Sequence, residues 1–167
     1  MRIVTAHLDM IPLTADDADD LFEVLDDPEL GRFTGESPPP DVEFLRERFA
    51  FWSARRAPDL DELWLNWVVR RREDERAVGH MQATVGDGDA SIAWVVGTAF
   101  QGRGIATEAS TALIGWLRAT LGVPLIRAMV HPDHVASQAV AARVGLRPTE
   151  RWLDGEVVWT DEPAPRT

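Results

Sequence analysis

The segment that most constrains this chain runs from Trp94 to Ala109, where an apolar strand passes through a glycine-bearing turn directly into a helix. Gly102 and Gly104 lie in the turn, and glycine can adopt positive φ and let a ligand approach the backbone closely. The first N–H groups of a helix have no partner inside it, and the helix dipole adds partial positive charge there. Arg103 adds a cation to the same turn. The segment therefore predicts an anion site, most naturally for phosphate; the alternative is an ordinary strand-to-helix connection.

Composition limits the classes of protein to which the chain can belong. Its 167 residues, 45% of them hydrophobic, predict a single domain over residues 1–167 with a frayed tail over residues 161–167. The chain has no Cys, which excludes disulfides, thiolate catalysis and thiolate metal ligands, and no Lys, which excludes Schiff-base chemistry. No stretch approaches the roughly 18 apolar residues of a membrane span, so we expect no membrane partner and a cytoplasmic location.

Net charge bears on the partners of the protein. The formal charge is −11, and the one basic run, Arg70–Arg72, is followed at once by acidic residues. Binding to nucleic acid needs clustered cations, so we expect no nucleic-acid partner. An acidic protein suits a cationic substrate such as an amine, although acidity that merely aids solubility explains the charge equally well.

Hydrophobic periodicity predicts an α/β arrangement around this segment. Period-two alternation predicts a half-buried strand from residue 63 and further strands over residues 77–85 and 91–96 in an antiparallel meander. The next strand, over residues 125–130, returns over the central helix and makes a parallel β-α-β crossover. The other expected elements are a first strand near residues 3–8, helices from about residues 14, 40 and 135, a loop over residues 29–40, and a final hairpin over residues 146–160 that turns at Asp154-Gly155.

These residues resemble a known family. Gln101-Gly102-Arg103-Gly104-Ile105-Ala106 is similar to the Q/R-x-x-G-x-G/A acyl-CoA loop of the GCN5-related N-acetyltransferases (GNAT). The run from residue 94 to 109, the strand Asn66–Val69 and the segment His134–Leu146 resemble the RimJ/RimL-like subgroup, which acetylates ribosomal-protein N-termini. The resemblance extends from Leu8 to Trp159. It implies a mixed, mostly antiparallel sheet with a central V-shaped split, flanked by about four helices.

The resemblance also implies acetyl-CoA as the donor substrate, with no metal. The N–H groups from Gly102 to Thr107 would hold the pyrophosphate, and the pantetheine arm would lie in the split between residues 92–96 and 126–130. The main chain at Val95 and Val96 would pair with pantetheine and help polarise the thioester carbonyl. The residues that the resemblance assigns to acetyl-CoA are Trp94, Val95, Val96, Gln101, Gly102, Arg103, Gly104, Ile105, Ala106, Thr107, His134 and Ser137.

The implied reaction is direct attack of a neutral amine on the thioester in a ternary complex, which requires an acid for the departing thiolate. Many family members use a Tyr at the position of Ala141, but this chain has no Tyr. Ser137 is the first candidate, because the subgroup is thought to use a serine there; its alternatives are helix capping and a hydrogen bond to the cofactor. His134 has three candidate roles, which are pantetheine binding, proton transfer and helix capping. Metal binding is disfavoured, because His131 and His134 lack a further clustered ligand set.

The remaining predictions name residues that could bind the acceptor amine or remove its proton. We expect Trp52, Trp67, His80 and Gln82 to line the substrate cleft, although aromatic residues more often belong to the core. The candidate general bases are His80, Glu150, Glu156 and a water chain, with an exposed salt bridge or turn as the alternative for each carboxylate. The acceptor is a protein N-terminus, a small amine or an antibiotic, and a homodimer is possible. A CoA-binding module without catalysis is the second hypothesis, while a nucleotide site is disfavoured because no G-x-x-x-x-G-K-[ST] motif is present.

Overall fold

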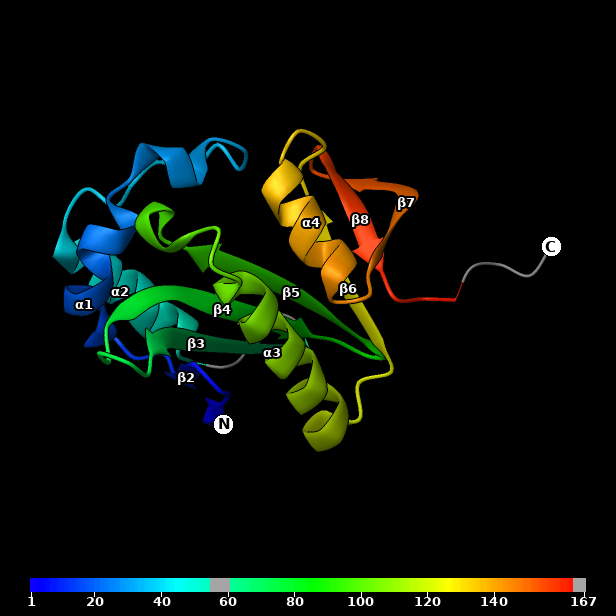
Figure 1. Cartoon of the computed structure of the whole chain (residues 1–167), viewed down its shortest axis with the longest axis horizontal. Helices are drawn as coiled ribbons and strands as arrows, with labels where there is room; N and C mark the ends of the chain where they lie inside the picture. The colour runs from blue at the N-terminus through cyan, green and yellow to red at the C-terminus, as the bar shows by residue number, and fades with distance from the viewer. Residues whose placement is uncertain (55–60, 164–167) are drawn as a thin grey trace.

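The computed structural model describes residues 1–54 and 61–163. Runs of strands are separated by helices along this length, and two short 3-10 turns precede α2 and α3 (Figure 1). The elements in chain order are β1 Ile3–Val4, β2 Leu8–Pro12, α1 Asp17–Leu25, η1 Pro28–Gly31, α2 Val42–Trp52, β3 Leu63–Arg71, β4 Ala77–Val85, β5 Asp89–Val96, η2 Thr98–Phe100, α3 Ile105–Leu121, β6 Leu125–Val130, α4 Val135–Arg143, β7 Arg147–Leu153 and β8 Glu156–Thr160.

The strands form one eight-stranded sheet in the order β1-β2-β3-β4-β5-β6-β8-β7. All neighbouring pairs are antiparallel except β5 and β6, which are parallel because α3 crosses between them. The predicted mixed, mostly antiparallel sheet and its parallel crossover are therefore confirmed.

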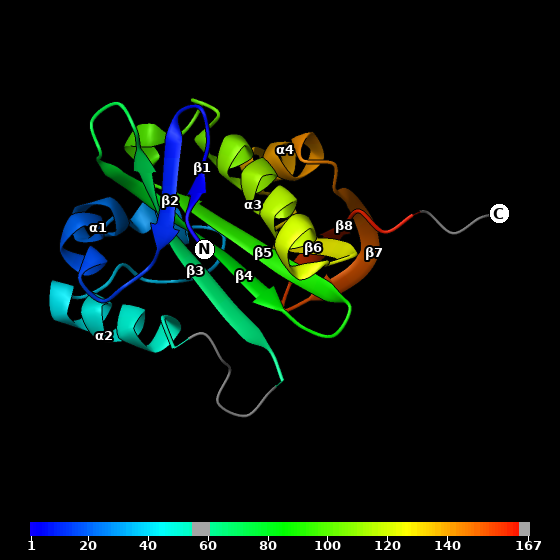
Figure 2. The same ribbon diagram turned by 90° about the horizontal axis from the view of Figure 1, so that it is seen from below.

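Helices cover both faces of the sheet (Figures 1 and 2). On one face α3 packs its Ala109, Leu113 and Leu117 into the larger of two hydrophobic cores. On the other face α1 and α2 enclose a smaller core, to which α2 contributes Leu45 and Phe49. Each helix buries one apolar stripe, as its sequence spacing predicts.

Local chemistry explains where the helices begin and end. At the start of α1, Asp17 accepts hydrogen bonds from the backbone N–H and the hydroxyl of Thr14, which forms one half of a capping box. Asp41 caps α2 by accepting the N–H of Phe44 at 2.8 Å. Gly104 and Gly122 flank α3 in the left-handed conformation, with φ of 80° and 66°. The sequence places these boundaries correctly because each depends on a residue type within one turn of the helix end.

Two expectations about strands are wrong. The single strand expected near residues 3–8 is a hairpin of β1 and β2, because the Thr5 N–H donates to the Leu8 carbonyl and the Leu8 N–H donates back to Thr5 Oγ1, each at 2.9 Å. The middle of β3 is buried rather than half-buried, since α3 covers one of its faces and α1 and α2 cover the other. Period-two spacing shows which face a residue occupies but not whether that face is covered.

Two further expectations need correction. The residue spacing of α2 predicts that Phe44 and Phe51 widen its buried stripe, but they are 42% and 53% exposed, because the sheet contacts only the side that carries Leu45 and Phe49. The tail is held at its start, because Asp161 accepts the Ile126 N–H at 2.8 Å and forms an ion pair with Arg118. Residues 164–167 lie outside the described residues.

Candidate active site

The sheet splits at the pair of parallel strands. Pairing between β5 and β6 covers only Asp89 to Ser91 on β5, and it ends where Ser91 meets Arg127. From that point the two strands diverge (Figure 1), which confirms the predicted V-shaped split. The backbone groups of residues 92–96 that face β6 have no strand partner there, so those that no side chain binds need a ligand or water.

A large cleft occupies the split. Its volume is about 1180 Å³, above the roughly 300–1,000 Å³ typical of a site for a drug-sized molecule. It is lined by β4, β5, the first turn of α3, the first turns of α4, the end of α2 and the segment from residue 27 to 39. One cleft of this size can hold a long cofactor and a second substrate together.

The turn before α3 offers unpaired donors to this cleft. The first backbone bond of the helix joins the Glu108 N–H to the Gly104 carbonyl at 2.9 Å. Among the residues described, the N–H groups from Gly102 to Thr107 appear in no hydrogen bond, as expected for a first helical turn. Gly102 and Gly104 have φ of 73° and 80°, and a Cβ on either would meet no atom within 4 Å, so both face open space. This is the geometry of an anion site at a helix N-terminus.

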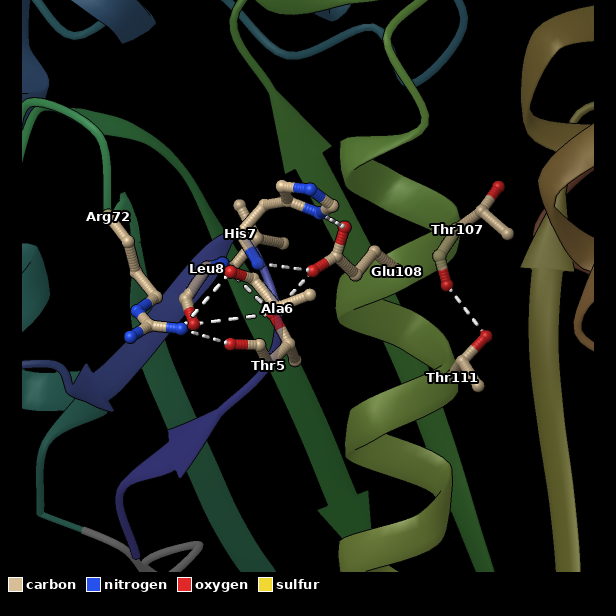
Figure 3. Close-up of polar contacts among 8 residues, drawn as sticks. All are labelled: Thr5, Ala6, His7, Leu8, Arg72, Thr107, Glu108 and Thr111. Atoms are coloured by element: carbon tan, nitrogen blue, oxygen red, sulfur yellow. Dashed lines mark hydrogen bonds and ion pairs between the residues drawn. The ribbon is translucent and has the colours of Figure 1, made fainter.

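The β1–β2 hairpin fixes this turn in place (Figure 3). Glu108 Oε1 accepts the Thr5 hydroxyl at 2.5 Å and the His7 N–H at 2.9 Å, while Oε2 lies 3.0 Å from His7 Nδ1. Although burial opposes the charge, these contacts lower the pKa of Glu108. Arg72 holds the other side of the hairpin by donating to the Thr5 and Ala6 carbonyls. The hairpin therefore anchors the helix whose first turn lines the cleft.

A close approach of β4 and the side chain of Gln101 fix the backbone of β5 near the split. A Cβ on Gly79 of β4 would lie 2.0 Å from the Val95 carbonyl oxygen, so the two strands can approach at this point only with glycine. Gln101 Nε2 donates to the Val96 carbonyl at 2.9 Å and ties the turn back to the strand. Backbone geometry at the wide end of the split therefore depends on both residues.

Helix α4 supplies His134 and Ser137 to the cleft lining. His134 is the N-cap, and its Nδ1 accepts the Ser137 N–H at 3.4 Å. Because Nδ1 is the acceptor, the neutral ring carries its proton on Nε2, where it can donate. Burial and the neighbouring His131 lower the pKa of His134, which favours this neutral form. Of its three candidate roles, capping is present in the structure.

The other end of the cleft contains Trp52, His80 and Gln82. His80 is 7% exposed, and its Nδ1 has no hydrogen-bond partner within the described residues. Its ring packs against Trp52 at a centroid distance of 5.6 Å. Burial, and then the charge of Arg48, lower the pKa of His80 to about 4, so the ring is neutral at pH 7.

Trp67 was predicted to line the substrate cleft, and this is wrong. Its side chain is fully buried in the core under α3, where it packs edge-on against Trp116 at 5.5 Å and donates to the Met1 carbonyl. Residues on a strand alternate between faces, so Asn66 and Val68 face α1 and α2 while Trp67 faces α3.

The structure places some of the remaining predicted residues in the cleft and others outside it. All of the residues predicted to bind the donor line the cleft except Arg103, whose side chain is exposed outside it. Of the candidate bases, Glu150 is exposed and does not line the cleft, whereas Glu156 does. Burial raises the pKa of Glu156, although His131 opposes the shift. Ala141, at the position of the family's Tyr, is fully buried in the core.

Phe33 and Arg48 also line the cleft, although neither was predicted to do so from the sequence. Phe33 stacks on His134 at a centroid distance of 4.3 Å, so the segment after η1 reaches α4. No sequence signal indicates this contact, because an irregular loop has no periodicity. Arg48 lies one helical turn before Trp52 on α2, and that i, i+4 spacing from a predicted cleft residue is a signal that could have found it.

Two observations bear on metal binding and on membrane spanning. Within residues 1–54 and 61–163, no three His, Cys, Asp or Glu side chains are grouped so that they could hold a metal ion. None of the helices in that part of the chain has both the length and the apolarity needed to cross a membrane.

Comparison with known proteins bears on the fold and on the family. Solved structures with the same fold include a candidate ribosomal-protein-serine acetyltransferase from Vibrio cholerae, which is 21% identical with a TM-score of 0.79 and 96% of each chain covered. The microcin C7 self-immunity acetyltransferase MccE, solved with acetyl-CoA and AMP, is 15% identical with a TM-score of 0.76, covering 93% of this chain and 92% of that chain. The aminoglycoside acetyltransferase AAC(6')-Ib, solved with coenzyme A, is 17% identical with a TM-score of 0.73 and 92% of each chain covered.

The assignment of the chain to a family rests on a sequence match and not on these solved structures. No curated protein sequence matches the chain. Residues 7–147, which include the split, the turn before α3 and helix α4, match the acetyltransferase (GNAT) domain. The protein therefore belongs to the GNAT acetyltransferase family.

Proposed function

We propose that this protein transfers an acetyl group from acetyl-CoA to a primary amine by direct attack within a ternary complex, and that residues 1–167 form one acyltransferase domain. The observation that carries the proposal is the meeting of two features in one cleft. The free N–H groups of the first turn of α3 suit a pyrophosphate, and the open edge of β5 suits the amides of a pantetheine arm. MccE and AAC(6')-Ib, which share the fold, were solved with acetyl-CoA and CoA.

In this mechanism the amine nitrogen attacks the thioester carbonyl carbon and the C–S bond breaks. The CoA thiolate takes one proton, and the nitrogen, which becomes positively charged on attack, loses one. Ser137 lines the cleft on α4, and we assign its hydroxyl as the proton donor to the thiolate. We choose Ser137 because its hydroxyl carries a proton at the cleft, whereas the chain has no Tyr, and Ala141, at the position of the family's Tyr, is buried and has no proton to donate.

We assign the neutral imidazole of His80 as the group that receives the amine proton, directly or through water. His80 lines the cleft, and its Nδ1 has no hydrogen-bond partner within the part of the chain that the structure describes, which supports this role. A weak base suffices, because the nitrogen is far more acidic after attack than in the free ammonium. Glu156, with its raised pKa, is the alternative base in the same cleft. His134 then serves by capping α4 and presenting Nε2–H to the bound donor.

The test is release of free thiol from acetyl-CoA across a panel that contains peptides with free N-termini, amino acids, polyamines and aminoglycosides. Thiol release that depends on one class of amine supports the proposal. Tight binding of CoA with no turnover on any amine would favour the second hypothesis, a CoA-binding module, which the missing Tyr keeps open. ATP or NAD binding more tightly than CoA would contradict both. Homodimer formation and a cytoplasmic location stay predictions from the sequence.

A further inference from the structure

A cation lines the part of the cleft that contains Trp52 and His80. Arg48 extends from α2 beside two aromatic rings, with its guanidinium carbon 4.8 Å from the centroid of Phe44 and 5.8 Å from that of Trp52. It forms no ion pair with the described residues. Arg46, on the same helix, forms ion pairs with Asp19 and Glu43.

The surroundings of Arg48 favour the binding of an anion by its guanidinium. Aromatic faces restrict a guanidinium by cation–π attraction, and its planar fork matches the oxygens of a carboxylate or phosphate. The acidic residues that line this cleft are Asp27, Glu29, Glu36, Glu108, Asp133 and Glu156, and none of them forms an ion pair with Arg48. Asp27 instead accepts the Thr98 hydroxyl at 2.6 Å, and Glu29 pairs with Arg32 at 3.5 Å. A ligand anion would therefore be the first counter-charge that Arg48 receives.

His80 gives a second, independent observation at the same place. His80 lines the cleft beside Arg48, and its buried Nδ1 has no hydrogen-bond partner among the residues described. Arg48 is the charged residue whose field lowers the pKa of His80, and the other neighbours of the ring, Phe49 and Trp52, are uncharged. An anion bound to Arg48 would offset that field and make His80 more basic when the acceptor is in place.

We infer that the acceptor is an amine that also carries an anionic group, a carboxylate or a phosphate, and that Arg48 binds this group. This inference rests on the proposed acetyl transfer and names the substrate class of that site. It replaces the cationic acceptor suggested by the net charge of −11. Exposed charges are screened beyond about 10 Å at ordinary salt, so the net charge of the whole chain says less about the acceptor than the guanidinium of Arg48, which lines the cleft and forms no ion pair with the described residues.

The test compares matched pairs of acceptors that differ only in the anion. Glycine is paired with glycinamide to test a carboxylate, and phosphoethanolamine with ethanolamine to test a phosphate. We expect the anionic member of at least one pair to have a kcat/KM about tenfold or more higher, and Arg48→Gln to remove this preference. The pair with the larger ratio identifies the anion. Arg46→Gln on the same helix removes a charge away from the cleft and should leave the preference unchanged.

Equal kcat/KM within both pairs, or a preference that survives Arg48→Gln, would overturn the inference. A second measurement decides the case in which none of these small amines is acetylated. Inorganic phosphate is titrated into enzyme saturated with CoA, and the pKa of His80 is followed by NMR, which is practical because the chain has 4 His.

Phosphate should raise the pKa of His80 in the wild-type protein and not in Arg48→Gln. No change in the wild type, or the same change in both proteins, overturns the inference. Failure of the proposed function has a different signature, in which phosphate acts through Arg48 but no amine in the wider panel releases thiol from acetyl-CoA.

Discussion

Replacing Gly104 tests whether the turn before α3 binds the donor, and Gly122 at the other end of the same helix provides a matched control. Both glycines are left-handed, with φ of 80° and 66°, and a Cβ on either would meet no protein atom within 4 Å. Alanine at either position should therefore cost the same backbone strain, about 1–2 kcal/mol. For a chain of this length that corresponds to a fall in Tm of about 2–8 °C in each variant.

The two variants should differ in donor binding. Gly104 lines the cleft and Gly122 does not, so only Gly104→Ala places a methyl group where the pyrophosphate would approach. Loss of one N–H bond to a charged oxygen costs about 1.5–3 kcal/mol, which raises the KM for acetyl-CoA roughly tenfold to a hundredfold. The assay is initial-rate thiol release at varied acetyl-CoA, together with thermal unfolding. Equal KM values for the two variants at equal Tm would refute the assignment of this turn.

Three further predictions concern catalysis and stability. Ser137→Ala should lower kcat about a hundredfold with little change in acetyl-CoA affinity by calorimetry, and an unchanged kcat would remove Ser137 from the mechanism. Gly79→Ala should destabilise the protein by about 1–3 kcal/mol, because its Cβ would lie 2.0 Å from the Val95 oxygen, whereas Gly115→Ala in the open middle of α3 should stabilise it slightly; equal Tm shifts would contradict the clash. The pKa of His80 is about 4 folded and 6.5 unfolded, so between these values the unfolded chain binds more protons and stability falls as pH drops. Urea unfolding at pH 7 and pH 4 should show a loss about 3 kcal/mol larger in the wild type than in His80→Gln, and parallel pH curves for the two proteins would disprove the burial of a neutral ring.

Much of the fold could be predicted because its determinants are local in the sequence. Asp41 begins α2 through its own side chain, and Gly122 ends α3 because glycine tolerates left-handed φ. The turn at Asp154-Gly155 has positive φ at both residues, as a two-residue hairpin requires. The split was predicted by resemblance, and the structure confirms it where β5 and β6 stop pairing at Ser91.

The errors arise where the outcome depends on which element packs against which face. Trp67 and His80 are both strand residues with aromatic rings, yet one lies under α3 and the other faces the cleft, and no local pattern separates them. Phe33 belongs to an irregular segment, so its stacking on His134 depends on a chain path that periodicity does not encode. Arg48 was missed because a charged residue on a helix is normally solvated; only the cleft gives it a role.

The central claim is that this cleft moves an acetyl group from CoA to an amine, and one mass balance tests it most directly. Acetyl-CoA labelled in its acetyl group is incubated with the protein and the amine panel, and free thiol and labelled products are counted in the same samples. The account predicts one labelled amide for each thiol released, and no thiol release when the amine is omitted. Label recovered as free acetate, or no thiol release with any amine although acetyl-CoA binds, would contradict it.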